Sequence, residues 1–201
     1  MKSLVLAAGL MASFLLPAHA ASISKTYSYF QIGGTTLEEI EGELQRRGPH
    51  VESTGARHPG ATRMEFSTRI TYHERGGLCS VAKARVTVKA EMILPRWNRR
   101  RSADGDTRFV WDALSSDIRR HEESHITIAK NHARELEDAL TDIFNYRGCD
   151  AAQQKAEATR ASILAKHDRA QLEFDRIENV NFEKRLLRLM RYRLEQQESG
   201  R

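Results

Sequence analysis

The sequence predicts an α+β fold, in which a small antiparallel sheet with a short helix packs on a long antiparallel helical hairpin. In the N-terminal half, segments alternate apolar and polar residues with a period of two, as half-buried strands do. In the C-terminal half, apolar residues recur every three or four positions along two long stretches, as in amphipathic helices. Strands and helices therefore separate along the chain, which is typical of the α+β class.

Residues 1–20 have the features of a secretory signal peptide. Lys2 supplies the positive charge, residues 4–16 form a short apolar run, and Ala18-His19-Ala20 fits the small-x-small cleavage pattern. We therefore expect cleavage near Ala20 and a periplasmic or secreted protein. An uncleaved N-terminal anchor is the alternative, although the run is short for a membrane span.

Residues 21–180 are expected to form one domain with its own core, followed by a basic amphipathic tail at residues 181–201. The formal net charge is +5, with basic clusters at residues 96–101 and in the tail. The tail could dock on the core, on a partner protein or on an anionic membrane surface. No nucleic-acid motif accompanies the charge, so we expect no nucleic-acid partner.

Residues that typically end a strand or begin and end a helix predict the first strand and the short helix. Residues 23–32 are rich in aromatic and β-branched residues and stop at Gly33-Gly34, which predicts a strand. Thr36-Leu37-Glu38-Glu39 is a capping box, and it predicts a helix that runs to about Arg47. Gly48-Pro49 should end this helix.

Two further strands are predicted at residues 63–73 and 79–94, where apolar residues alternate with polar ones. Glu74-Arg75-Gly76-Gly77 between them indicates a hairpin, and Pro95 is expected to close the second strand. An edge strand of this sheet could line a cleft and pair with a peptide backbone. Alternatively, the sheet could only cover the helices.

A long helix is expected from about Thr107 to Tyr146, followed by a break at residues 147–150 and a second long helix from about Ala151. Their short connection predicts an antiparallel hairpin. The stripe of the first helix comprises Trp111, Leu114, Ile118, His121, His125, Ile128, His132, Leu136, Leu140 and Ile143. The stripe of the second helix comprises Ile163, His167, Ala170, Phe174 and Ile177.

The two cysteines, Cys79 and Cys149, are expected to form one disulfide in an exported protein. Closing a loop of roughly 70 residues would contribute about 4 kcal/mol in the chain-entropy model. Neither cysteine is near the histidine motif in sequence, so a zinc–thiolate role is the weaker interpretation.

The segment His121-Glu122-x-x-His125 contains the candidate metal-binding and catalytic residues. Histidines four residues apart lie on one face of a helix and can both bind one Zn²⁺ through their ring nitrogens. Glu122 between them could then act as general base toward a metal-activated water that attacks a peptide bond. The alternative is a pair of core histidines that are hydrogen-bonded to carbonyl groups.

A catalytic zinc needs a third protein ligand. If the hairpin turns near Gly148, antiparallel pairing brings residue 175 level with His121, so Asp175 is the first candidate. Glu178, one turn further, is the second, although either carboxylate could instead pair with Arg120 or Arg176. His132 is third, because an unbroken helix carries it about 10 Å beyond His125.

Several motifs together resemble one bacterial family. They are Gly33-Gly34-Thr35-Thr36, Gly48-Pro49, Arg75-Gly76-Gly77-Leu78-Cys79, Leu94-Pro95, His121-Glu122-x-x-His125, Cys149 and Phe174-Asp175. In this order they resemble the family of predicted secreted zinc-dependent proteases catalogued as domain of unknown function 922. The likeness extends to about residue 178 and implies a zinc metallopeptidase. Many relatives carry His-Gly after the Phe-Asp pair, whereas this chain has Val180-Asn181 near that place and so lacks a histidine ligand there.

We therefore expect a secreted or periplasmic hydrolase that uses Zn²⁺ to cleave a peptide or protein substrate. One alternative is a non-catalytic metal-binding or interaction domain that keeps the motif as a structural site. Another is a helical adaptor of the cell envelope that holds no metal and uses its basic tail.

Overall fold

The structure of the protein is a computed structural model that describes residues 21–52 and 54–199. The predicted signal peptide at residues 1–20 lies outside the described residues, so export stays a prediction. The elements, in chain order, are β1 (Ser22–Ile32), α1 (Leu37–Arg47), β2 (His50–Val51), β3 (Ala56–Arg57), β4 (Ala61–Arg75), β5 (Leu78–Trp97), a 3₁₀ turn (Arg100–Ser102), α2 (Gly105–Thr141), β6 (Tyr146–Arg147) and α3 (Cys149–Ser199).

The predicted α+β class is confirmed, but the sheet is mixed rather than antiparallel. Strand β5 lies between β1 and β4; it pairs antiparallel with β4 and parallel with β1. The end of β1 at Ile32 lies beside Trp97, and β4 begins opposite Ile93 at the same end of the sheet. The connection from β1 to β4, which includes α1, therefore begins and ends at the same end of the sheet. As a result β1 runs antiparallel to β4 and parallel to β5.

The β4–β5 hairpin is confirmed. Gly76 and Gly77 form its turn with φ values of 61° and 76°. Two successive positive φ values match a type I′ turn, whose twist suits a two-residue hairpin.

Pro95 does not close β5, which continues to Trp97. Beyond Ile93 the strand is paired with β1 alone, so the missing N–H of Pro95 need not interrupt a ladder on the β4 side.

Helix α1 begins as predicted. The Thr36 hydroxyl accepts a hydrogen bond from the Glu39 N–H, and the Glu39 carboxylate accepts one from the Thr36 N–H, which completes the capping box. Buried Ile40 and Leu44 pack against Trp97 and Trp111 at one end of the sheet. This small cluster fixes α1 beside the N-terminal part of α2.

Helix α2 ends at Thr141, earlier than the predicted Tyr146. Ile143 accepts a hydrogen bond from the Val81 N–H, and Asn145 has a positive φ of 58°. Tyr146 and the next residue then pair with β5 as β6, so tertiary pairing replaces the last predicted turn.

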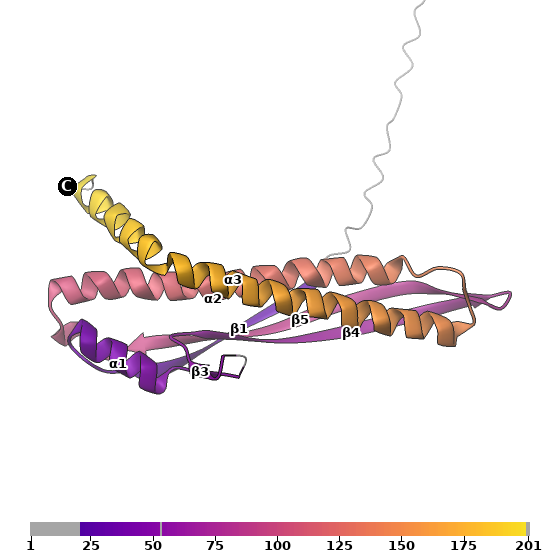
Figure 1. The fold of residues 1–201 in the computed structure, drawn as a ribbon, viewed down its shortest axis with the longest axis horizontal. Coiled ribbons are helices and arrows are strands. Elements are labelled where there is room, and N and C mark those ends of the chain that lie inside the picture. Colours follow the sequence, from indigo (N-terminus) through magenta and orange to yellow (C-terminus); the bar gives the residue numbers. More distant parts are fainter. Residues whose placement is uncertain (1–20, 53, 200–201) are drawn as a thin grey trace, which may run out of the picture.

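The helical hairpin is confirmed, and α2 and α3 lie side by side along the sheet (Figure 1). Cys79 and Cys149 form the predicted disulfide, which joins β5 to the start of α3. Helix α3 continues unbroken past residue 180, and its C-terminal part, yellow in Figure 1, bends away from the sheet. None of the helices in the described part of the chain combines the length and the apolar composition that a membrane crossing needs.

Candidate metal centre

The two motif histidines lie on the flank of α2 that faces α3. The fully buried face of α2 comprises Glu122, Ile126, Ala129 and Ala133. The histidines are therefore less buried than their place in the predicted apolar stripe implied, with side-chain exposures of 25% for His121 and 13% for His125. Their position at the seam between the helices leaves their ring nitrogens open to groups from α3.

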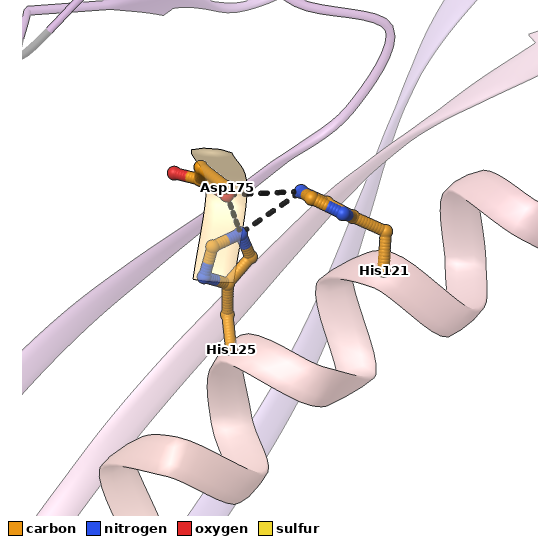
Figure 2. A group of neighbouring side chains, drawn as sticks. All are labelled: His121, His125 and Asp175. Carbon is orange, nitrogen blue, oxygen red and sulfur yellow. Dashed lines mark hydrogen bonds and ion pairs between the residues drawn. The ribbon is translucent and has the colours of Figure 1, made fainter. Parts of the chain in front are cut away.

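Helix α3 brings Asp175 to both histidines (Figure 2). The Nε2 atoms of His121 and His125 are 3.0 Å apart. Oδ1 of Asp175 lies 3.3 Å from Nε2 of His121 and 3.0 Å from Nε2 of His125. Within residues 21–52 and 54–199, these side chains form the one group of histidine, cysteine and acidic residues placed to hold a metal.

The size of this triangle fits a metal. Four donors at about 2.0–2.1 Å from a tetrahedral ion lie about 3.3 Å apart, close to the three distances seen here. Oδ1 of Asp175 is buried and has no aligned hydrogen bond. A lone pair with no donor is costly when buried. A cation inside the triangle would satisfy all three donors together, so the residues fit a metal ion.

The electrostatics of the cluster favour a charged carboxylate beside charged or metal-bound imidazoles. Burial alone would raise the pKa of Asp175, but the facing His121 and His125 outweigh it and lower that pKa well below its usual range. Burial would likewise lower the pKa of His125, but the facing Asp175 carboxylate and the side-chain oxygen of Gln171 raise it instead. The contacts therefore favour negative charge on Asp175 and positive charge on His125.

Gln171 sets the tautomer of His125. Its Nε2 lies 3.1 Å from the carbonyl oxygen of His125, which can only accept a hydrogen bond, so this contact fixes the orientation of the amide. Its Oε1 then lies 2.6 Å from Nδ1 of His125, and that nitrogen must donate. A neutral ring with its proton on Nδ1 leaves the Nε2 lone pair free for a metal.

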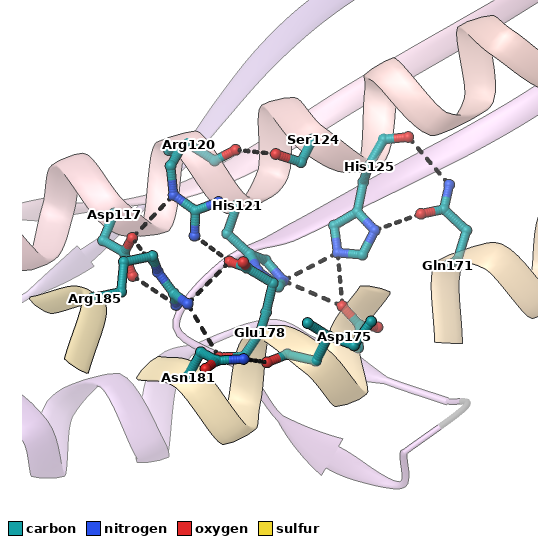
Figure 3. Close-up of polar contacts among 11 residues, drawn as sticks. Asp117, Arg120, His121, Ser124, His125, Gln171, Asp175, Glu178, Asn181 and Arg185 are labelled. Carbon is teal, nitrogen blue, oxygen red and sulfur yellow. Dashed lines mark hydrogen bonds and ion pairs between the residues drawn. The ribbon is translucent and has the colours of Figure 1, made fainter. Parts of the chain in front are cut away.

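Glu178 lies beside His121 and connects it to a partly buried ion network (Figure 3). Its Oε2 lies 3.6 Å from Nδ1 of His121 and also contacts Arg120. Asp117, which is almost fully buried, accepts hydrogen bonds from Arg120 and from both Nε and an amino group of Arg185. Burial would raise the pKa of Asp117, but the two guanidinium groups lower it. This network fixes α3 against the first half of α2.

We predict that Gln171→Leu weakens zinc binding by about 10- to 100-fold, because His125 loses the acceptor that holds its tautomer. Gln171→Glu keeps an acceptor for Nδ1 and should retain most of the affinity. Competition with a chromophoric chelator measures both, with exposed Leu172→Ala as the control. Unchanged zinc affinity in Gln171→Leu would contradict this role.

Glu122 points toward β4 and lies in the wall of a cavity of about 430 Å³ that His121 and Asp175 also line. Its Oε2 accepts a hydrogen bond of 2.8 Å from Oγ1 of Thr62. Burial raises the pKa of Glu122, and the hydrogen bond from Thr62 opposes this shift. A cation bound nearby would favour the ionised carboxylate, which a general base requires.

Gly60 allows this close approach. A Cβ atom at that position would lie 2.9 Å from Oε1 of Glu122 and 2.8 Å from a methyl carbon of Ile118. The absence of a side chain at residue 60 therefore lets the chain reach the site just before β4.

The other two candidate ligands, Glu178 and His132, do not join the metal cluster. Glu178 is paired with Arg120, as one alternative expected, while also contacting His121. His132 lies outside the cluster, with its Nδ1 3.0 Å from Oε2 of Glu135. Arg176 pairs with Glu173 rather than with either candidate ligand.

Sequence reasoning missed three contributors. Gln171 could have been found, because the antiparallel register that places Asp175 level with His121 also places residue 171 level with His125. His58 lines the cavity and has its Nε2 2.7 Å from Oγ1 of Thr54. No periodicity points to His58 or Thr62, since they reach the site through a loop and an edge strand.

The fold and the site define an α+β protein with a cluster of two histidines and one carboxylate beside a buried glutamate. The family described as "Bacterial protein of unknown function (DUF922)" matches residues 27–183, and the chain belongs to this family. The family resemblance expected from the motifs is thereby confirmed, and the description itself states no activity. No curated protein and no solved structure matched the chain.

Proposed function

We propose that this protein is an exported zinc-dependent peptidase that hydrolyses peptide bonds in a peptide or protein substrate. The observation that supports the proposal is the triangle of donors from His121, His125 and Asp175. Two of these residues, His121 and Asp175, line one cavity together with Glu122. Two imidazoles and one carboxylate are a ligand set of catalytic zinc sites. The disulfide between Cys79 and Cys149 supports export, because such bonds persist in oxidising compartments.

Each residue has a defined task in this proposal. His121, His125 and Asp175 hold the ion, which when bound supplies Lewis acidity and lowers the pKa of water. Glu122 accepts the proton of the attacking water and passes it to the leaving amine. Thr62 holds one oxygen of Glu122 in place and leaves the other carboxylate oxygen available for the proton.

We expect the protein spanning residues 21–201 to bind about one zinc per chain and to cleave members of a peptide library. Removing zinc with a chelator should abolish cleavage, and adding zinc back should restore it. Elemental analysis and mass spectrometry of the products measure the two effects. Full zinc content without any cleavage would favour the non-catalytic metal-binding alternative, and absence of zinc after reconstitution would refute both.

A further inference from the structure

A second cavity adjoins the metal centre, and most of the residues that line it are apolar. It has a volume of about 400 Å³, within the range of about 300–1,000 Å³ of small-molecule sites. It lies where α1, α2 and α3 meet. The apolar side chains that line it include Leu37, Ile40, Trp111, Leu114, Phe182 and Leu186.

The apolar cavity lies beside the metal cavity. Pro59, Leu114 and Phe182 line both, so they form a shared wall. Leu114 precedes His121 by seven residues on α2, which is about 10 Å along the helix axis. An extended peptide covers this distance in about three residues. A chain held at the metal would therefore bring a nearby side chain over the apolar cavity.

The walls of the apolar cavity differ in burial. Ile40 and Trp111 are buried and form part of its floor, while Phe182 and Leu37 are 39% and 43% exposed. Exposed apolar side chains beside a cavity lose contact with water when an apolar group enters. The charged groups that also line the cavity, Glu41 and Arg57, have opposite signs and select for neither charge.

We propose that this cavity is a specificity subsite that binds a large apolar side chain, aromatic or aliphatic, located two or three residues from the bond that is cut. This subsite rests on the proposed peptidase function. It assigns substrate selection to α1 and to the part of α3 from Phe182 onward, neither of which supplies a residue of the metal cluster. In this proposal, Phe182 and Leu186 of α3 belong to the substrate-binding site.

The test measures binding separately from cleavage. Three fluorescently labelled peptides are built from alanine, serine and glycine and differ only at one position, which holds Phe, Ser or Glu. Each peptide is titrated with zinc-loaded Glu122→Gln protein, and the fluorescence anisotropy of the label reports binding. We expect the Phe peptide to bind at least about tenfold more tightly than the Ser or Glu peptide. Equal binding of the three peptides would overturn the subsite.

Two neighbouring leucines provide a matched pair of variants. Leu186→Glu places a charge in the apolar cavity and should remove the preference for Phe. Leu187→Glu changes an exposed side chain outside the cavity and should keep the preference. If Leu186→Glu does not fold, Leu37→Glu serves instead, because an acid in the first turn of α1 suits the helix dipole. Equal losses in the cavity variant and Leu187→Glu would refute the assignment.

The outcomes separate the subsite from the peptidase proposal. A Phe preference that Leu186→Glu removes, without cleavage by the zinc-loaded wild type, supports the cavity as a ligand site and refutes the peptidase. Cleavage without any preference for an apolar residue supports the peptidase and refutes the subsite. A dimer that Leu186→Glu dissociates in light-scattering measurements would place a second copy in the cavity and overturn the proposal.

Discussion

Replacing Glu122 with glutamine is expected to abolish peptide hydrolysis while leaving zinc content and fold unchanged. The amide has nearly the same shape and can keep the contact with Thr62, but it cannot accept the proton of the attacking water. Loss of a general base costs about 10²- to 10⁴-fold in rate, and the residual turnover should lie near background. Steady-state kinetics on a cleaved peptide, with elemental analysis of the same sample, gives both quantities.

Glu123 provides the matched control, since it is the adjacent acid on the same helix. It is partly exposed and forms an ion pair of 2.7 Å with Lys25, away from the cavity. Glu123→Gln should therefore retain both zinc and activity. If Glu122→Gln lost zinc, Glu122 would be a ligand or a fold determinant; if it kept full activity, another group would be the base.

Replacing either histidine of the cluster should abolish tight zinc binding. With His121→Ala or His125→Ala, only two of the three donors remain. The loss should exceed the 10- to 100-fold that removal of an outer-shell partner typically costs, about 1.4–2.7 kcal/mol. Zinc per chain after dialysis against a chelator of known affinity measures it. His132→Ala, on the same helix but outside the cluster, should bind zinc as the wild type does.

Asp175→Asn and Glu178→Gln test the third ligand within the same experiment. Asp175 contacts both ring nitrogens that face the metal position, whereas Glu178 contacts the far nitrogen of His121. Asp175→Asn should therefore weaken zinc binding more than Glu178→Gln does. The reverse order would make Glu178 the ligand. Stoichiometric zinc in the double variant His121→Ala/His125→Ala would place the metal elsewhere.

Much of the fold follows from local patterns, and the structure bears this out. The capping box at Thr36, the Gly76-Gly77 turn and the long helical periodicities each depend on neighbouring residues, and each element appears where expected. The errors lie where partners are distant. Pro95 was expected to end a strand, and Tyr146 to continue a helix, until pairing with β1 and β5 decided otherwise.

The candidate site divides in the same way. His121, Glu122 and His125 could be read from one helical turn, and Asp175 from the length of two helices and one turn between them. Gln171 follows from the same register. His58, Gly60 and Thr62 could not be read, because they come from a loop and an edge strand whose approach to α2 has no local signal.

By itself, the sequence determined the helices, the hairpins and the spacing that places two imidazoles on one flank of α2, because hydrogen bonds and side-chain periodicity within a helix or hairpin specify these features. The tertiary structure alone decided the parallel pairing of β1, the approach of His58 and Gly60 to the site, and the burial of Glu122 against Thr62. These features depend on packing between elements that are far apart in the chain, where a shift of one residue turns a different side chain toward the site.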